Sequence, residues 1–493
     1  MESLLSKDEL LSAVNGTQIG SAECLFNDVQ TDSRNVSVEK PCMFVPLMGE
    51  FQNGHKYIPD VLTSDKKASV ILLNEAEYKA DTAYYNSLAV ENPSVCFVRV
   101  ENTLHALQDA AEAYVAKKCR NMILVSITGS SGKTTTKEMM VSVARAYFGD
   151  NGVAYTYGNL NSETGLPLSV FKIRGDEKIG IFEMGMNRVN EIGEISKVLK
   201  SRYGIITNIG TAHIGILGSQ KNIAEEKRKS LKYIPENGAA VVGADDSFAD
   251  FCTENVRGKV VKFGRNVPVE VSGVRFIEDK GLFGTDFELD GLFVHLPLSG
   301  SYNYLNALSV IACAKEIGIP AAEIKRGLER VSAISGRMEV CEVVLRTGKK
   351  VVLIKDCYNA NLDSMLKVID FCSGLKDIGR KFFVLADMKE LGAESEKSHE
   401  TIGERINEVM PDFIYLIGPE MCAASKAVKD KHNLKWFEVS SMQNFEKIAA
   451  DINLNAEDKD VILLKGSHSM QLEKLVPLLS SNMNNQKSEE VIK

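Results

Sequence analysis

Short apolar runs alternate with amphipathic segments along most of the chain. In the first hundred residues, apolar runs bounded by polar turns predict buried strands at 42–47, 70–73 and 95–100. The segment 101–118 then carries apolar residues at helical spacing and predicts an amphipathic helix. This helix leads into the apolar run 122–127, which predicts the first strand of a second domain.

From residue 122 to about 335, short apolar strands alternate with helices. Further strands are expected at 178–183, 203–208 and 239–242. This alternation is typical of a parallel sheet with helices on both faces. The segment 257–298 is richer in strand patterns, which indicates an insertion or an extension of the sheet.

A new set of strands follows Gly336-Arg337-Met338. The expected strands are 340–346, 350–355, 382–385, 413–417 and 461–465. We therefore predict an α/β protein with an N-terminal domain (1–100), a central domain (101–335), a C-terminal domain (336–480) and a disordered polar tail (481–493). A length of 493 residues suits about three domains.

The clearest chemical signal is Val125-Ser-Ile-Thr-Gly-Ser-Ser-Gly-Lys-Thr-Thr-Thr-Lys137. An apolar strand runs into a glycine turn, and a helix predicted at 137–147 follows. Glycines let backbone N–H groups face a phosphate, and a helix N-terminus adds partial positive charge. Ile127 stands where the common P-loop has its first glycine, so the pattern predicts a less common triphosphate site.

Composition narrows the class of protein. The chain is 44% hydrophobic and 25% charged, which is ordinary for a globular protein. A net charge of −8 argues against a surface for nucleic acid or anionic lipid, so phosphate recognition must be local. The ten scattered cysteines lack a C-x-x-C pair, and we expect a reducing cytoplasm without zinc or a disulfide framework. We find neither a signal peptide nor an apolar run of roughly 18 residues, so no membrane span is expected.

Polar residues at predicted strand ends are the remaining candidates. Glu183 ends one strand, and its position beside the phosphate loop suits a Mg²⁺ ligand as well as a solvated strand end. His213 follows another strand, although a lone histidine is more often structural and Mg²⁺ prefers oxygen. The strand ends at 356–361 and 386–392 indicate a functional edge or ordinary turns. The turns at 31–34 and 48–55 suit a second anion or are plain loops.

Taken in order, these segments resemble the Mur ligases of bacterial cell-wall synthesis. The matching segments are the loop 128–138, Tyr157-Gly-Asn-Leu-Asn161 with 165–168, Glu183-Met-Gly185, and Asn208-Ile-Gly-Thr-Ala-His213 with Gly218-Ser219. The resemblance covers residues 31 to about 475. The segments 356–361 and 386–392 are the most specific to the member that adds D-alanyl-D-alanine to a UDP-sugar tripeptide.

The resemblance implies a UDP-sugar domain, a central ATPase and a Rossmann-like C-terminal domain. It implies an ATP-dependent ligase that uses Mg²⁺, acts in the cytoplasm and works as a monomer on small-molecule substrates. The implied ATP contacts are Thr128, Gly129, Ser130, Ser131, Gly132, Lys133, Thr134, Thr135, Asn303, Asn306, Arg337 and Asp356. The implied metal ligands are Thr134, Glu183, His213 and Lys227, the last as a carbamate, because a bare ammonium cannot ligate a cation. The implied catalytic residues are Lys133, Glu183, His213, Lys227 and Arg337. The implied substrate contacts are Asp32, Ser33, Arg34, Asn159, Asn161, Tyr358, Asn359 and Asn361.

The chain departs from the family pattern on the substrate side. The departures are Ser162, Lys229, Tyr302, Lys355, Leu362 and His468. Other readings are a ligase adding diaminopimelate or lysine, a folate-extending ligase, a P-loop kinase or motor, and an inactive nucleotide sensor. The short loop and the absence of a helicase-like basic surface disfavour a kinase or motor, and the retained Lys133, Glu183, His213 and Lys227 disfavour an inactive sensor.

Overall fold

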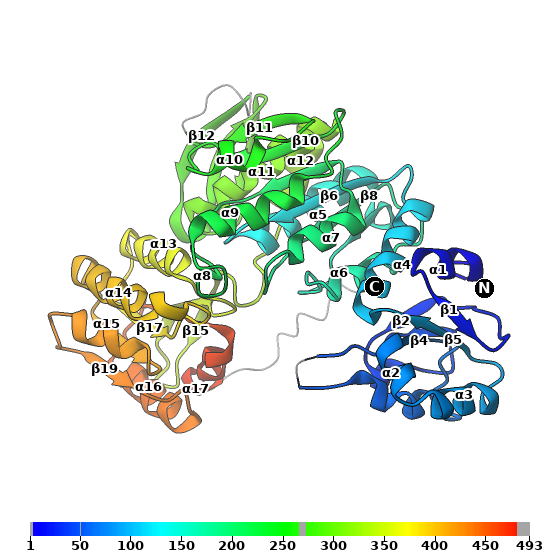
Figure 1. Ribbon diagram of the computed structural model, residues 1–493. Coiled ribbons are helices and arrows are strands. Elements are labelled where there is room, and N and C mark those ends of the chain that lie inside the picture. Colours follow the sequence, from blue (N-terminus) through cyan, green and yellow to red (C-terminus); the bar gives the residue numbers. More distant parts are fainter. Residues whose placement is uncertain (1–2, 50, 266–272, 481–493) are drawn as a thin grey trace.

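The computed structural model describes residues 3–49, 51–265 and 273–480, and it arranges their strands in separate sheets along the chain (Figure 1). The N-terminal sheet has the order β1-β5-β4-β3-β2. Its strands are β1 (Thr17–Ile19), β2 (Asp28–Gln30), β3 (Cys42–Phe44), β4 (Val70–Asn74) and β5 (Cys96–Val100). Only β1 pairs antiparallel within this described sheet. Its helices are α1 (Lys7–Ala13), α2 (Glu75–Ala80) and α3 (Thr82–Glu91).

The N-terminal sheet contains one departure from the expected free thiols. The structure joins Cys24 to Cys96 in a disulfide, and the other described cysteines are free. Spacing could not reveal this pair. The two residues are 72 positions apart, and the packing of the N-terminal core brings their Cα atoms to 5.4 Å.

The central sheet is parallel throughout and has the order β11-β10-β9-β6-β8-β7. Its strands are β6 (Ile123–Thr128), β7 (Val153–Tyr155), β8 (Ile179–Glu183), β9 (Tyr203–Ile206), β10 (Ala239–Gly243) and β11 (Lys259–Phe263). The helices of this region are α4 (Thr103–Lys118), α5 (Lys133–Phe148), α6 (Gly165–Val170), α7 (Glu191–Leu199), α8 (Ile214–Leu217), α9 (Gln220–Arg228), α10 (Ala249–Thr253), α11 (Ser301–Ile317) and α12 (Ala321–Glu329). One apolar cluster packs each face of the sheet, as the sequence predicted.

The predicted β-rich insertion forms a small antiparallel sheet of its own. Its strands are β12 (Val274–Asp279), β13 (Thr285–Leu289) and β14 (Leu292–Leu296). The inward residues Phe287, Leu289, Val294 and Leu296 are buried in the same cluster as α11. This small sheet therefore extends the core on one face of the central sheet.

The C-terminal sheet has the order β15-β16-β20-β17-β18-β19, and only β15 runs antiparallel to its neighbour. Its strands are β15 (Glu339–Val344), β16 (Lys350–Asp356), β17 (Lys381–Ala386), β18 (Phe413–Ile417), β19 (Leu434–Phe437) and β20 (Val461–Lys465). Its helices are α13 (Leu362–Ser373), α14 (Ser395–Val409), α15 (Met421–Ala427), α16 (Met442–Asn455) and α17 (Val476–Leu479). The tail 481–493 that we expected to be disordered lies outside the described residues. The predicted domain boundaries near 100 and 335 stay predictions.

The helix after the phosphate loop begins earlier than the sequence pattern indicated. We expected it at 137–147, whereas α5 begins at Lys133. Gly132 takes the left-handed conformation (φ 80°) and caps the helix, so the lysine and the threonines become its first turn. Polar residues there do not interrupt the helix because its first N–H groups are free to meet an anion.

Candidate functional site

The phosphate loop lies between β6 and α5, in the middle of the central sheet. Gly129 and Gly132 have φ angles of 151° and 80°, a region that favours glycine. A Cβ at Gly129 would lie 1.9 Å from Thr207 Oγ1, and one at Gly132 would lie 2.7 Å from Asn306 Oδ1. Both glycines are therefore required by close contacts as well as by backbone conformation.

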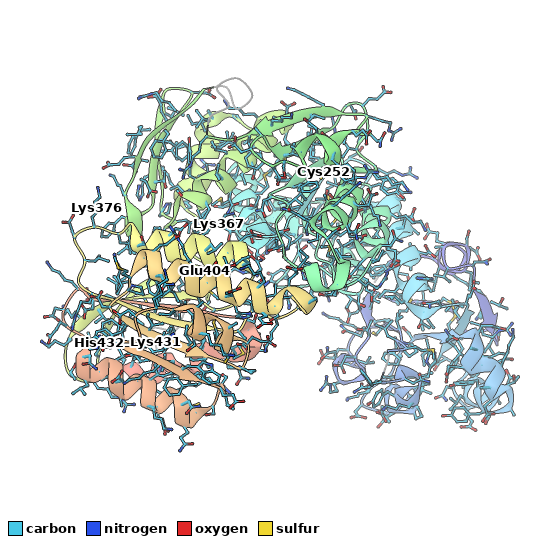
Figure 2. All side chains as sticks on the ribbon, turned by 60° about the vertical axis from the view of Figure 1, so that its left-hand side comes forward. Cys252, Lys367, Lys376, Glu404, Lys431 and His432 are labelled. Carbon is cyan, nitrogen blue, oxygen red and sulfur yellow. A yellow bond between two sulfur atoms is a disulfide. The ribbon has the colours of Figure 1, made fainter. Side chains whose placement is uncertain are left out.

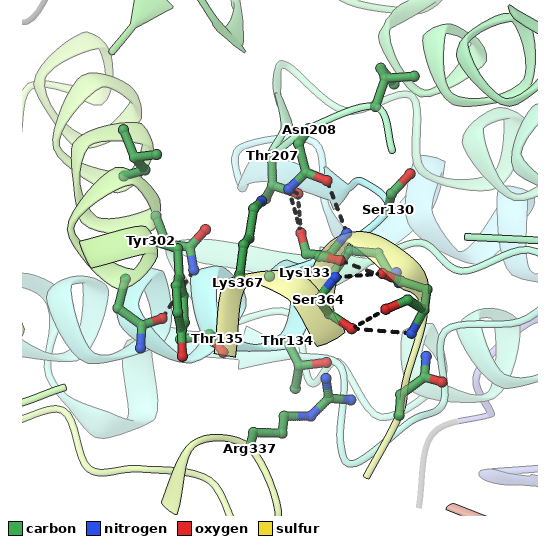
Figure 3. A pocket seen from close by; sticks show the side chains of 18 of the residues that line it. Ser130, Lys133, Thr134, Thr135, Thr207, Asn208, Tyr302, Arg337, Ser364 and Lys367 are labelled. Carbon is green, nitrogen blue, oxygen red and sulfur yellow. Dashed lines mark hydrogen bonds between the residues drawn. The ribbon is translucent and has the colours of Figure 1, made fainter. Parts of the chain in front are cut away.

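The end of β9 holds the loop in shape. Thr207 Oγ1 and Asn208 Nδ2 donate to the Ser131 carbonyl at 2.6 and 2.9 Å, and Ser131 N donates to Asn208 Oδ1 at 3.1 Å (Figure 3). Gly210 N also donates to Ser130 Oγ at 2.8 Å. The loop is thus fixed from a neighbouring strand before any ligand binds.

Two lysine ammonium groups donate to the same carbonyl. Lys133 Nζ lies 2.9 Å and Lys227 Nζ 3.0 Å from Gly129 O. Lys227 comes from α9 and is only 1% exposed. Burial lowers the pKa of Lys227 well below its ordinary value, and the charge of Lys133 acts in the same direction. Burial also lowers the pKa of Lys133, although the Glu183 carboxylate opposes this.

Glu183 ends β8 and is 1% exposed. Its Oε1 accepts a hydrogen bond from Asn161 Nδ2 at 2.7 Å, whereas its buried Oε2 has no hydrogen-bond partner among the described residues. A buried unsatisfied carboxylate oxygen is costly, and a bound cation would satisfy it. The solvated strand end that we considered from sequence is therefore excluded.

His213 meets the C-terminal domain. It takes a positive φ of 65° directly before α8, and its Nδ1 lies 2.7 Å from Glu390 Oε2. His213 lowers the pKa of the Glu390 carboxyl, and burial opposes the shift. The backbone reinforces this junction, because Gly215 N donates to the Glu390 carbonyl at 3.2 Å.

The C-terminal domain presents the ends of β16 and β20 to the loop. Asp356 Oδ2 lies 2.8 Å from Lys465 Nζ, and its Oδ1 accepts from Met338 N at 3.1 Å. The Arg337 guanidinium lies over the Tyr358 ring, 4.2 Å from its centroid. Asn361 Nδ2 donates to Ser131 Oγ at 3.4 Å, so this edge touches the phosphate loop directly.

These groups surround one cavity of about 740 Å³, a size that suits a nucleotide with a second substrate. It gathers most predicted site residues: Ser130, Ser131, Gly132, Lys133, Thr134, Thr135, Asn159, Asn161, Glu183, His213, Asn303, Asn306, Arg337, Asp356, Tyr358, Asn359 and Asn361. Of the residues predicted for ATP and metal, Thr128, Gly129 and Lys227 do not line it: the Thr128 hydroxyl donates to Met184 O, and Lys227 Nζ donates to Gly129 O.

The predicted uridine-diphosphate turn is not part of this cavity. Asp32 Oδ1 caps a short helical turn at Arg34 N, and the Arg34 side chain pairs with the same carboxylate. The Arg34 guanidinium lowers the pKa of Asp32 to about 2. Ser33 is largely buried between them. The turn offers an exposed cation, and its assignment to a uridine diphosphate stays a prediction.

Several lining residues were missed by sequence reasoning. Thr207, Lys367, Glu390 and Lys465 line the cavity without having been proposed as site residues. Lys367 projects from α13 where that helix meets the central domain, and it is exposed (Figures 2 and 3). Their positions at strand ends could have indicated Thr207, which directly follows β9, and Lys465, which is the last residue of β20. Lys367 lies on a helix, where a lysine carries no such signal.

Two further features of the described residues concern side chains that could bind a metal ion and helices that could span a membrane. Among the described residues, no group of three or more His, Cys, Asp or Glu side chains is placed to hold a metal ion. The metal set implied by the family resemblance is a mixed one, which adds the Thr134 hydroxyl and a Lys227 carbamate to Glu183 and His213. Within the same residues, none of the helices combines the length and apolar character needed to span a bilayer.

The chain matches two family models. Residues 127–314 match the Mur ligase middle domain, and residues 336–468 match the Mur ligase glutamate ligase domain. Among curated proteins, it is 37% identical over 482 residues to the UDP-N-acetylmuramoyl-tripeptide–D-alanyl-D-alanine ligase of Treponema pallidum, covering 97% of this chain and 99% of that one. It is 29% identical over 461 residues to the enzyme of the same name from Bacillus subtilis, covering 92% and 93%.

Solved structures give the same picture. A MurF crystal structure from Acinetobacter baumannii matches with a TM-score of 0.80 at 25% identity, covering 95% of this chain and 97% of that one. A MurF ligase from Thermotoga maritima in complex with ADP matches with a TM-score of 0.72 at 25% identity, covering 92% and 96%. The fold and the order of its domains are thus shared over nearly the whole chain.

Proposed function

The chain belongs to the Mur ligase family, and we propose that it joins D-alanyl-D-alanine to UDP-N-acetylmuramoyl-tripeptide at the expense of ATP. Its full-length similarity to ligases of that specificity carries the assignment. The cavity supports it, because the phosphate loop and the 356–361 edge face each other across one space. The product is the pentapeptide precursor of peptidoglycan.

The reaction has two steps. A carboxylate oxygen of the tripeptide attacks the γ-phosphorus of ATP, the bond to the β-γ bridging oxygen breaks, and an acyl phosphate and ADP result. The free amine of D-alanyl-D-alanine then attacks the acyl carbon, phosphate leaves, and the nitrogen loses its proton to solvent. Lys133 and Arg337 line the cavity and are assigned to neutralise the charge that develops on the transferred phosphoryl group.

The chain's own residues mainly position the reactants. The backbone N–H groups at the start of α5 are assigned to the phosphates, and Asn303 and Asn306 line the cavity from α11. Asp356 is assigned to the ribose, and Lys465 fixes its carboxylate from behind. Asn159, Asn161, Tyr358, Asn359 and Asn361 are assigned to the tripeptide or the acceptor.

The donor set fits Mg²⁺ in part. Glu183 supplies a buried oxygen that has no hydrogen-bond partner within the described part of the chain, and the Thr134 hydroxyl stands at the start of α5. Lys227 fits only as a carbamate, and its lowered pKa favours the neutral amine that adds to carbon dioxide. His213 is the least suited because Mg²⁺ prefers oxygen ligands. When bound, Mg²⁺ would offset phosphate charge during transfer.

The N-terminal turn with Asp32, Ser33 and Arg34 is assigned to the UDP moiety. The exposed Arg34 guanidinium, already oriented by Asp32, suits a diphosphate. Cytoplasmic location and a monomeric state remain predictions. Hinge motion near residues 100 and 335 is proposed as the way in which the domains open for substrate entry.

A phosphate-release assay tests the function. Purified protein is given Mg²⁺, ATP and UDP-N-acetylmuramoyl-tripeptide, and D-alanyl-D-alanine, D-alanine and L-amino acids are compared as acceptors. We expect phosphate release only with D-alanyl-D-alanine. Release stimulated by an L-amino acid alone would overturn the acceptor, and failure to bind adenine nucleotide would overturn the assignment as a whole.

A further inference from the structure

Tyr302 is a cavity residue to which the proposed chemistry gives no role. It is the second residue of α11, next to the assigned Asn303 and one helical turn before Asn306. Asn306 lies against Gly132 of the phosphate loop, and Tyr302 lines the same cavity as Asp356, the residue assigned to the ribose.

The ring of Tyr302 is held firmly. It folds back over Gly300, where a Cβ would lie 2.6 Å from the ring carbon that carries the hydroxyl. Gly300 has a φ of 92°, so both the conformation and the contact favour glycine there. The ring also packs against the apolar cluster of the C-terminal domain that contains Met338 and Ile354. Tyr302 is therefore a residue of the central domain whose side chain packs at the junction with the C-terminal domain.

The hydroxyl at the end of this fixed ring is buried and has no hydrogen-bond partner among the described residues. A buried hydroxyl left unsatisfied is costly, and a bound ligand group would satisfy it. Burial raises the pKa of Tyr302 well above its ordinary value, and the Asp356 carboxylate adds to the shift. The phenol is therefore a hydrogen-bond donor near neutral pH, and Asp356 lies close enough to influence it.

We propose that the Tyr302 hydroxyl donates a hydrogen bond to a ribose hydroxyl of the bound nucleotide, opposite the Asp356 carboxylate. The ribose then has a neutral donor from the central domain and a charged acceptor from the C-terminal domain. Because the same ring packs against the C-terminal apolar cluster, nucleotide binding and domain contact share one side chain. This inference rests on the proposed use of ATP and adds a residue that hydrogen-bonds the ribose of the nucleotide.

Tyr302→Phe tests the idea because it removes only the hydroxyl. We expect the Kd for ADP, measured calorimetrically, to rise about 3- to 10-fold, which is the size of one net hydrogen bond. The ligand-free variant should melt at the same temperature as the wild type or higher, because a buried unpartnered group is gone. Tyr304→Phe is the matched control, since Tyr304 is a buried tyrosine of the same helix outside the cavity.

Deoxynucleotides identify the contact. If Tyr302 binds the ribose, its substitution should have no further effect with 2′-deoxy-ADP or with 3′-deoxy-ADP, whichever lacks the contacted hydroxyl. Inorganic tripolyphosphate should bind wild type and variant equally. An effect that persists with both deoxynucleotides, or that appears with tripolyphosphate, overturns the ribose contact. An unchanged Kd for ADP with a lowered melting temperature shows a structural hydroxyl instead. Wild-type protein that binds no ADP contradicts the proposed function, which is a different failure.

Discussion

Asp363 provides the sharpest test of how the C-terminal domain is held against the phosphate loop. Its Oδ2 accepts hydrogen bonds from Thr211 N at 2.7 Å and from Thr211 Oγ1 at 3.0 Å. Asp363 is in the first turn of α13, whereas Thr211 follows β9, so both bonds cross between the two domains. A Cβ at Gly210 would lie 2.2 Å from the same oxygen, which shows that the Asp363 carboxylate packs closely against the backbone of Gly210.

The magnitude follows from those two bonds. Hydrogen bonds to a charged group contribute about 1.5–3 kcal/mol each when shielded, but both partners here are only half-buried. With about 1 kcal/mol for each bond, Asp363→Ala weakens the contact by about 2 kcal/mol. At 1.4 kcal/mol per factor of ten, the equilibrium constant for closure falls roughly 30-fold. Asp363→Asn keeps one neutral acceptor and should lose about half of that free energy.

The assay is phosphate release at limiting ATP. We expect kcat/KM for ATP to fall about 5- to 30-fold in Asp363→Ala and less in Asp363→Asn, because closure must precede phosphoryl transfer. Asp370→Ala is the control, since Asp370 lies on the same helix and pairs with Arg405. Small-angle scattering with ADP should show a more extended Asp363→Ala protein. A kcat/KM within twofold of wild type would refute the reasoning.

Three further predictions concern the residues around the phosphates. Arg337→Ala should lower kcat by about 100-fold or more with little change in melting temperature, because a charge-neutralising group is lost from a cavity wall; near-normal turnover in the phosphate-release assay would contradict this role. Glu183→Gln should raise the Mg²⁺ concentration for half-maximal activity at least tenfold, since the unpartnered carboxylate oxygen loses its charge; an unchanged Mg²⁺ titration would remove Glu183 from the metal set. Lys227→Met should abolish most activity, and ¹³C-bicarbonate should give a carbamate NMR signal in wild type only. In buffer free of carbon dioxide, the pKa of Lys227 is lower in the folded protein than in the unfolded chain, so the unfolded chain binds more protons between the folded pKa and about 10.5. The free energy of unfolding should therefore rise with pH in that range, and more steeply in wild type than in Lys227→Met. Equal slopes in a series of melting temperatures against pH would show that the buried amine does not titrate.

Much of the candidate site was visible along the chain. The strand, the glycine turn and the lysine of the phosphate loop form one continuous segment, and local chemistry alone predicts an anion site there. Glu183 and Asp356 could be picked out because each ends an apolar strand. Parallel sheets bring the carboxyl ends of their strands to one edge, so position in a strand already indicates position in the site.

Pairings across domains could not be predicted in the same way. His213 with Glu390 and Thr211 with Asp363 join residues far apart in sequence, the second pair by 152 positions. No local period or spacing records such a contact, since it depends on how two separately folded sheets dock. The disulfide between Cys24 and Cys96 lies within the N-terminal domain, and it was missed because packing of that domain's core brings together residues 72 positions apart.

The sequence by itself determined the elements, their order and the phosphate loop, because strand burial, helical spacing and glycine conformation are local properties of the chain. Tertiary structure alone decided that Lys133 and Lys227 share one carbonyl, and that the buried Tyr302 hydroxyl has no partner among the residues that the structure describes. Desolvation and hydrogen-bond satisfaction depend on every neighbour in three dimensions. They therefore appear only when the chain has folded and its domains have met.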